Sequence, residues 1–144
     1  AILRRVGERM NILIIDGQGG RLGEQLIKAI TARLPEASIT AVGTNSTATA
    51  AMIKAGAQKA ATGENPVVVA CRKADVIIGP IGIVIADSMC GEVTPGMALA
   101  VGQADAVRIL IPMNKCENLV AGVTDFTMSA LVEDVLQKLG NICP

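Results

Sequence analysis

The stretch NILIIDGQGGRLG, residues 11–23, joins a short apolar run to a cluster of glycines. Within the short apolar run at residues 11–15, residues 12–15 are apolar without a break, which is typical of a strand buried on both faces. After the glycines, apolar residues recur at helical spacing as far as Pro35; they are Leu22, Leu26, Ile27, Ile30 and Leu34. The stretch therefore predicts a strand, a glycine turn and a helix in succession, which is the opening unit of a parallel α/β sheet.

The same alternation continues through the rest of the chain. Further strands are predicted at residues 39–42, 59–62, 76–78, 107–111 and 120–123, and helices at residues 47–55, 66–73, 94–103 and 129–139. Right-handed crossovers then give an α/β fold, a three-layer Rossmann-like doubly wound parallel sheet of about six strands in the order 3-2-1-4-5-6. We expect residues 10–144 to form a single nucleotide-binding domain and residues 1–9 to be an N-terminal extension.

The secondary structure of residues 66–73 is the hardest to predict from the sequence. They include three consecutive valines, which favour a strand by propensity. Asn65, however, is a good helix N-cap, and Pro66 fits the first position of a helix. A strand here would also have to turn back within about three residues, with no glycine in the gap. We therefore predict a helix.

Composition narrows the classes of function. Apolar residues make up 51% of the chain, yet it holds one Phe, no Trp, no Tyr and no His, with 13 basic and 13 acidic residues. Zero net charge without aromatic platforms argues against nucleic-acid binding, and the longest apolar run, residues 76–86, is too short to span a membrane. The spacing of the four cysteines fits neither a metal nor a redox motif, so we expect free thiols in the cytoplasm and no metal site. The high apolar content favours a homo-oligomer, with a dimer as the first choice.

The glycine cluster has the spacing of a phosphate-binding turn. Leu22 occupies the last glycine position of G-x-G-x-x-G, so the pattern that fits is G-x-x-G-x-x-G. This spacing resembles the turn of short-chain-dehydrogenase-like nucleotide binders, in which the middle glycine lets the backbone approach a pyrophosphate and the last lets the helix pack closely. The helix N-terminus and the Arg21 guanidinium would then hold the phosphate. The predicted phosphate-binding residues are Gly17, Gln18, Gly19, Gly20, Arg21, Leu22 and Gly23. The alternative is a glycine-rich turn that binds nothing.

Two further loops are expected at the same edge of the sheet, where ligands bind in open α/β sheets. The residues concerned are Thr44, Asn45 and Ser46 after the second strand, and Gly79, Pro80, Ile81 and Gly82 after the fourth. No acid occurs between Ala37 and Gly63, although NAD-binding sheets carry one at the end of the second strand to hold the ribose. Neutral side chains there tolerate a 2′-phosphate, so NADP, a mononucleotide or a phosphometabolite all remain candidate ligands.

Catalytic groups are scarce. Without His or Tyr, the chain cannot hold a His-based triad or a Tyr–Lys proton relay. Asp16, Asp87 and Cys90 remain as candidates for a small enzyme acting on a phosphorylated ligand. Asn114 and Lys115 follow the fifth strand and are interpreted as a solvated loop, with ligand contact as the alternative. The leading hypothesis is a nucleotide- or phosphometabolite-binding sensor or regulatory subunit. The small enzyme is the second hypothesis, and a structural or interaction protein without a ligand is the third.

Several segments are distinctive of a known family. They are NILIIDGQGG at residues 11–20, ITAVGTNSTATAAMIKAGA at 39–57, ATGENPVVV at 61–69, ADVIIGPIGIVIADS at 74–88, GEVTPGMALAVG at 91–102 and ILIPMNKC at 109–116. Through them, the chain from Met10 onward resembles an uncharacterised bacterial family known only as a domain of unknown function. The resemblance implies a stand-alone Rossmann-like protein, with no known activity and no functional residues to transfer.

Overall fold

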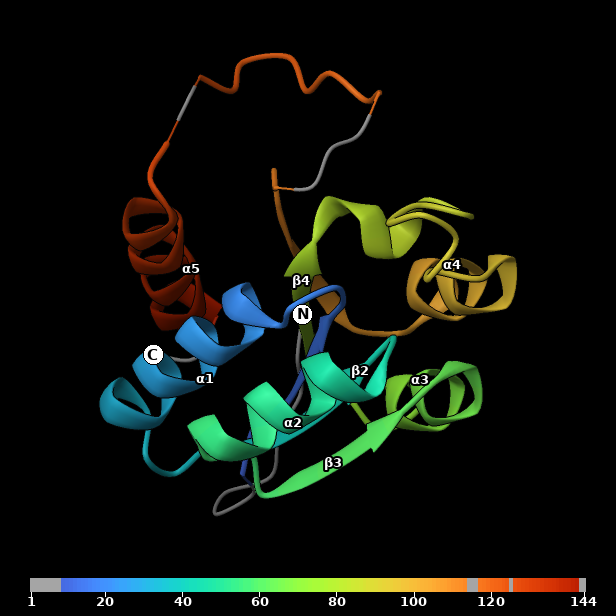
Figure 1. Ribbon diagram of the computed structural model, residues 1–144. Helices are drawn as coiled ribbons and strands as arrows, with labels where there is room; N and C mark the ends of the chain where they lie inside the picture. The colour runs from blue at the N-terminus through green and yellow to red at the C-terminus, as the bar shows by residue number, and fades with distance from the viewer. Residues whose placement is uncertain (1–8, 114–116, 125, 143–144) are drawn as a thin grey trace.

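A five-stranded parallel sheet in the order β3-β2-β1-β4-β5 forms the centre of the molecule (Figure 1). The structure is a computed structural model that describes residues 9–113, 117–124 and 126–142. The strands are β1 (Asn11–Asp16), β2 (Ser38–Gly43), β3 (Lys59–Thr62), β4 (Val76–Pro80) and β5 (Val107–Ile111). The predicted α/β class, the parallel pairing and the order of the first five strands are confirmed.

Helices cover both faces of the sheet, which gives the predicted three-layer Rossmann-like architecture (Figure 1). One core cluster contains buried residues of α1, α2 and α5, and the other contains buried residues of α3, α4 and the short 3-10 helix η1. The bounds are α1 (Arg21–Arg33), α2 (Ser46–Ala55), α3 (Glu64–Cys71), η1 (Ile81–Val84), α4 (Pro95–Gln103) and α5 (Met128–Ile142).

Strand β1 contributes to both core clusters. Ile12 and Ile14 pack on the side of α1, α2 and α5, whereas Leu13 and Ile15 pack on the side of α3 and α4. All four side chains are at most 2% exposed. Successive side chains of a strand point to opposite faces, so a strand covered on both faces is apolar at every position. This burial explains the unbroken apolar run in the sequence.

The sheet has five strands, not the six that the sequence predicts. Residues 120–123, the expected sixth strand, form a turn in which the amide of Val123 donates to the carbonyl of Val120 over 3.3 Å. Gly122 within this turn has a φ of 81°, in the left-handed region. A left-handed residue inside a tight turn interrupts the extended backbone that strand pairing needs. Strand β5 is therefore the edge of the sheet.

The valine-rich segment is helical, as predicted, but its start differs. Helix α3 begins at Glu64 and its N-cap is Gly63 rather than Asn65. The amide of Gly63 donates to the carbonyl of Gly43 over 2.9 Å, which ties the start of α3 to the end of β2. Helix α4 has Thr94 as its N-cap, where the Thr94 hydroxyl accepts a hydrogen bond from the amide of Met97.

Several further expectations concern thiols, membranes and loops. Cys71 and Cys90 are free, as expected, and burial raises the pKa of the Cys71 thiol to about 11. Among the described residues, no helix combines the length and the apolar character needed to cross a membrane. Residues 1–8, Asn114, Lys115, Cys116 and Cys143 lie outside the described residues.

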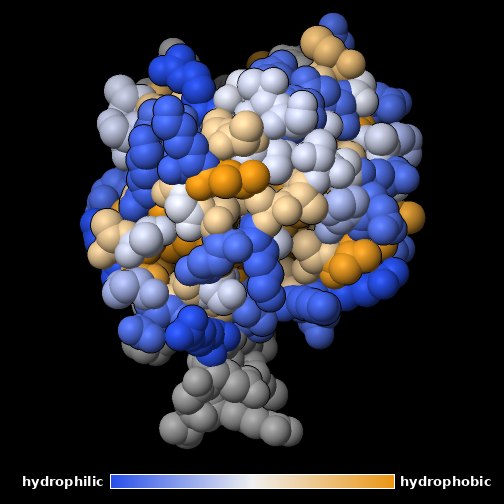
Figure 2. Space-filling model, turned by 60° about the horizontal axis from the view of Figure 1, so that its bottom comes forward, coloured by the Kyte–Doolittle hydropathy of each residue, from blue (hydrophilic) through white to orange (hydrophobic). Residues whose placement is uncertain are grey.

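Some apolar side chains reach the surface. Ile53 of α2 and Leu99 of α4 are more than half exposed, and Val69 of α3 is 38% exposed. The face turned forward in Figure 2 shows apolar residues gathered between hydrophilic ones rather than scattered singly. Apolar patches bordered by polar residues are typical of binding surfaces.

Candidate functional site

The candidate site lies where the carboxyl ends of β1 and β4 meet at one edge of the sheet. The strand order reverses at this point, because β1 pairs with β2 on one side and with β4 on the other. In open α/β sheets, ligands bind outside the strand ends at such a reversal. Two connections leave the sheet here: the glycine loop, residues 17–20, and the β4–α4 connection, residues 81–94.

Two of the three pattern glycines pack α1 against α2. Gly20 has a φ of 73°, and a Cβ on it would lie 2.8 Å from the Cα of Ala48. A Cβ on Gly23 would lie 2.6 Å from the Sδ of Met52. Helix packing therefore accounts for both glycines without a ligand, and for Gly20 this differs from the phosphate contact that the spacing suggests.

Gly17 allows the β4–α4 connection to lie directly on the glycine loop. A Cβ on Gly17 would lie 2.7 Å from the Sδ of Met89 and 3.0 Å from Oε1 of Glu92. Gly19 is different, because a Cβ there would have no atom within 4 Å. The loop therefore has one face covered by residues 81–94 and one face open to solvent at Gly19.

Glu92 is the side chain that joins the three loops of the site. Its Oε1 accepts hydrogen bonds from the backbone amide of Gln18 (2.9 Å), from the Thr44 hydroxyl (2.7 Å) and from Nδ2 of Asn45 (2.7 Å). Burial acts to raise the pKa of Glu92, but these three hydrogen bonds outweigh it and hold the pKa below its ordinary value. A carboxylate is thus held ionised at the end of β2, beside the glycine loop.

The buried Asp16 side chain binds backbone amides of the glycine loop and of the first turn of α1. It is 2% exposed, and its two carboxylate oxygens accept hydrogen bonds of 2.8 Å from the amides of Gly17 and Gly23. Burial raises the pKa of Asp16, and the amides of Gly23 and Gly17 offset part of that increase. The negative charge of Glu92 raises the pKa further. The side chain therefore satisfies two backbone amides that the turn would otherwise bury without an acceptor.

Three backbone amides around the α1 N-terminus keep free hydrogens. The amides of Gly19, Arg21 and Leu22 donate to no described residue. Gly19 and Arg21 are exposed, and both lie at or beside the first turn of α1. Unpaired amides at a helix N-terminus, together with the helix dipole, favour an anion.

The β4–α4 connection has an unusual backbone. Asp87, Met89 and Cys90 have φ angles of 65°, 55° and 57°, in the left-handed region that side chains rarely adopt. The Ser88 hydroxyl donates to the carbonyl of Gly82 over 2.5 Å, and the amide of Asp87 donates to the carbonyl of Val93 over 2.7 Å. These bonds close the connection into a compact loop that places Glu92 against Gln18.

The remaining predicted residues take different positions. Asn45 is the N-cap of α2, where its Oδ1 accepts from the amide of Ala48 over 2.9 Å, and Ser46 is exposed at the first position of that helix. After β4, Gly79, Pro80 and Gly82 are buried and Ile81 is half-buried. Asp87 and Cys90 are exposed, and within the described residues neither bonds to the glycine loop. No cluster of three His, Cys, Asp or Glu side chains suited to a metal occurs in the described part of the chain.

The whole described sheet falls within one family match. The chain matches, over residues 11–143, the model of a family described as a domain of unknown function, DUF3842. The chain belongs to the DUF3842 family. Comparisons with curated proteins and with solved structures found no match. The family description carries no activity, so the function of this DUF3842 chain has to be argued from the geometry of its site.

Sequence reasoning missed Glu92. Thr44 and Asn45 lie at the end of β2, but the acid that reaches this place comes from 48 residues further along the chain than Thr44. A usable signal was present, since Glu92 lies two residues before Thr94, the N-cap of the helix that follows the β4 connection. Acids in that connection reach the same edge of the sheet as the end of β2.

Proposed function

We propose that this protein binds a nucleotide at the glycine loop and acts as a sensor or regulatory subunit. The phosphate would lie at the N-terminus of α1, and the ribose would lie beside Glu92. The observation that carries the proposal is the Glu92 carboxylate, which three donors hold at the end of β2. This is where nucleotide-binding sheets of this type place the acid that bonds the ribose hydroxyls.

The phosphate-binding part rests on the free amides of Gly19, Arg21 and Leu22. A phosphate can accept hydrogen bonds from several such amides at once, and the helix dipole adds a favourable charge interaction. The exposed Arg21 side chain starts from the same turn and can add a charge-assisted bond. Asp16 opposes the phosphate less than an unpaired carboxylate would, because its two oxygens accept hydrogen bonds from the amides of Gly17 and Gly23.

The ribose-binding part rests on the second oxygen of Glu92. Oε1 receives all three hydrogen bonds, and Oε2 has no partner among the described residues. A carboxylate oxygen with free lone pairs can accept hydrogen bonds from a 2′- or 3′-hydroxyl. A 2′-phosphate in the same place would meet a like charge, which is costly. The proposed ligand therefore has a free 2′-hydroxyl, as in AMP, ATP or NADH, rather than the 2′-phosphate of NADPH.

Isothermal titration with AMP, ATP, NADH and NADPH tests both parts. We expect binding of at least one ligand with a free 2′-hydroxyl, and binding of NADPH at least about tenfold weaker than that of NADH, which corresponds to roughly 1.4 kcal/mol. Glu92→Gln removes the negative charge but keeps an acceptor, so it should narrow the difference between NADH and NADPH to about threefold or less.

Gly19→Val tests the phosphate position without disturbing the core, because a Cβ at Gly19 meets open space. The variant should lose ligand binding while its free energy of unfolding stays within about 0.5 kcal/mol of wild type. Gly102→Val is the matched control, since a Cβ at Gly102 in α4 also has no atom within 4 Å. Failure of all four ligands to bind would contradict the proposal, and equal binding of NADH and NADPH would contradict the role of Glu92.

A further inference from the structure

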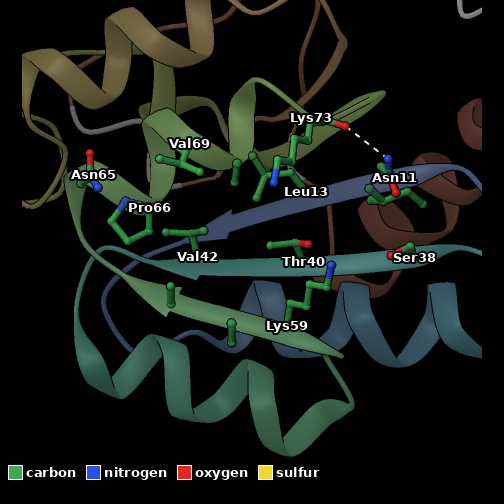
Figure 3. A pocket seen from close by; sticks show the side chains of 15 residues that line it. Asn11, Leu13, Ser38, Thr40, Val42, Lys59, Asn65, Pro66, Val69 and Lys73 are labelled. Carbon is green, nitrogen blue, oxygen red and sulfur yellow. Dashed lines mark hydrogen bonds between the residues drawn. The ribbon is translucent and has the colours of Figure 1, made fainter.

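A cavity of about 440 Å³ lies beside α3, on the face of the sheet formed by β1, β2 and β3 (Figure 3). Its volume is within the range of sites that hold small molecules. None of its lining residues belongs to the glycine loop or to the β4–α4 connection. The cavity, which we call the α3 cavity, is therefore separate from the proposed nucleotide site.

One end of the α3 cavity is apolar. Val42 of β2 forms the floor of this end, and Pro66 and Val69 of α3 form the facing wall (Figure 3). Leu13 of β1, which pairs with Thr40 in the sheet, extends the apolar floor toward the polar end. Val69 is 38% exposed, so the wall is only partly covered by the rest of the chain. This end offers a surface for a compact hydrocarbon group, whose burial from water is favourable in proportion to its area.

The other end of the α3 cavity is polar and positively charged. Lys59 of β3 and Lys73, which follows α3, extend toward the cavity from opposite walls, with Thr40 of β2 between them (Figure 3). Neither lysine forms an ion pair within the described residues. The hydroxyls of Thr40 and Ser38, both lining the cavity, also make no hydrogen bond in the described part of the chain.

The charged side chains that line the α3 cavity indicate which class of ligand it would bind. Among the described residues, none of those that line the cavity is acidic. Asp75, near its polar end, accepts a hydrogen bond from the amide of Asn11 over 2.7 Å. The described lining residues include no aromatic side chain either, so they offer no platform on which a nucleobase could stack. Two ammonium groups next to an apolar floor match a molecule with an anionic head and a short apolar body.

We propose that the α3 cavity binds a small amphipathic anion, with its head between Lys59 and Lys73 and its hydrocarbon chain against Leu13 and Val42. The head is a carboxylate or a phosphate monoester, since lysine ammonium groups and hydroxyls bind both. This site is spatially separate from the proposed nucleotide site and adds a second ligand to the protein.

Isothermal titration with octanoate, octyl phosphate and 1-octanol tests the proposal. At least one of the two anions should bind, and the neutral alcohol should bind at least about tenfold more weakly because it leaves both lysines without a counter-charge. The preferred anion identifies the head group as a carboxylate or a phosphate. The double variant Lys59→Gln with Lys73→Gln should weaken the anion by about tenfold or more, whereas Lys54→Gln, on the exposed face of α2, should not change it.

Three results would overturn the proposal. The first is that neither anion binds, and the second is that 1-octanol binds as tightly as octanoate. The third is that a second copy of the chain covers the cavity. Sedimentation velocity of wild type and of Val69→Arg at the same protein concentrations detects that case. If a second copy covered the cavity, wild type would sediment as a dimer and Val69→Arg as a monomer. A titration with AMP already present separates the two sites, because octanoate should still bind when the nucleotide site is filled.

Discussion

The glycine loop and the α3 cavity lie on the same sheet but differ in how their polar groups are paired. At the loop, the carboxylates of Asp16 and Glu92 accept hydrogen bonds from three backbone amides and two side chains. In the α3 cavity, Lys59, Lys73 and Thr40 make no such side-chain bonds within the described residues. Paired groups contribute to folding, whereas unpaired groups at the surface are available to a ligand. Substitution of the paired carboxylates at the loop should therefore cost stability, and substitution of the unpaired polar groups in the cavity should not.

Gly20→Val should give the largest effect. The left-handed φ and the 2.8 Å approach to the Cα of Ala48 leave no room for a side chain, so we expect a loss of about 3 kcal/mol or more. Urea unfolding followed by circular dichroism measures it. Gly19→Val, one residue away and facing open space, is the matched control. Equal stability of the two variants would show that Gly20 does not pack α1 on α2.

Asp16→Ala should rank second, because it leaves the amides of Gly17 and Gly23 without their acceptor. We expect a loss of about 2 kcal/mol at pH 7, compared with no more than about 0.5 kcal/mol for Thr40→Val in the α3 cavity. A loss for Thr40→Val as large as that for Asp16→Ala would remove the contrast between the two regions.

The same variant has a defined pH dependence. The folded chain raises the pKa of Asp16 above its ordinary value of 3.8, so the folded state binds a proton more tightly than the unfolded state. The stability of wild type relative to Asp16→Ala should therefore increase as the pH falls through the raised pKa toward 3.8, and stay constant above it. A difference that shrinks over that range would contradict the direction of the shift.

Glu92→Ala should have a smaller effect, of about 1 kcal/mol, since Glu92 is only half-buried and water can replace part of what is lost. The sharper measurement is amide hydrogen exchange at Gln18, whose amide loses its acceptor and should exchange faster. Lys59→Gln is the control from the α3 cavity and should leave both values unchanged. Unaltered exchange at Gln18 would show that Glu92 does not hold the loop.

The smallest effect concerns the backbone of the β4–α4 connection. Cys90 has a φ of 57° and an exposed side chain, so Cys90→Gly should be more stable than Cys90→Ala by about 1 kcal/mol. Thermal unfolding of the two variants measures the difference. If alanine were as stable as glycine, the left-handed conformation of the loop would be in doubt.

Sequence patterns predicted the fold better than the site. The run at residues 11–15 and the glycines after it were enough to predict β1, the turn and α1, because burial on both faces demands apolar residues at every position. The prediction of a strand at residues 120–123 was wrong, because apolar character alone does not exclude a turn around Gly122. Residue spacing also could not predict the hydrogen bond between Glu92 and the amide of Gln18, since that contact depends on how the β4–α4 connection folds back over the glycine loop.

The two regions are joined by one short piece of backbone. Leu13, on the floor of the α3 cavity, and Gly17, in the glycine loop, are separated by four residues of β1 and its end, roughly 13 Å of extended chain. A ligand that restricts the motion of this strand when it binds at one site lowers the conformational entropy that the protein must lose when a second ligand binds at the other site. Thermodynamic reciprocity makes any such cooperation equal in both directions, so a protein of this small size has the physical means to report on two metabolites jointly.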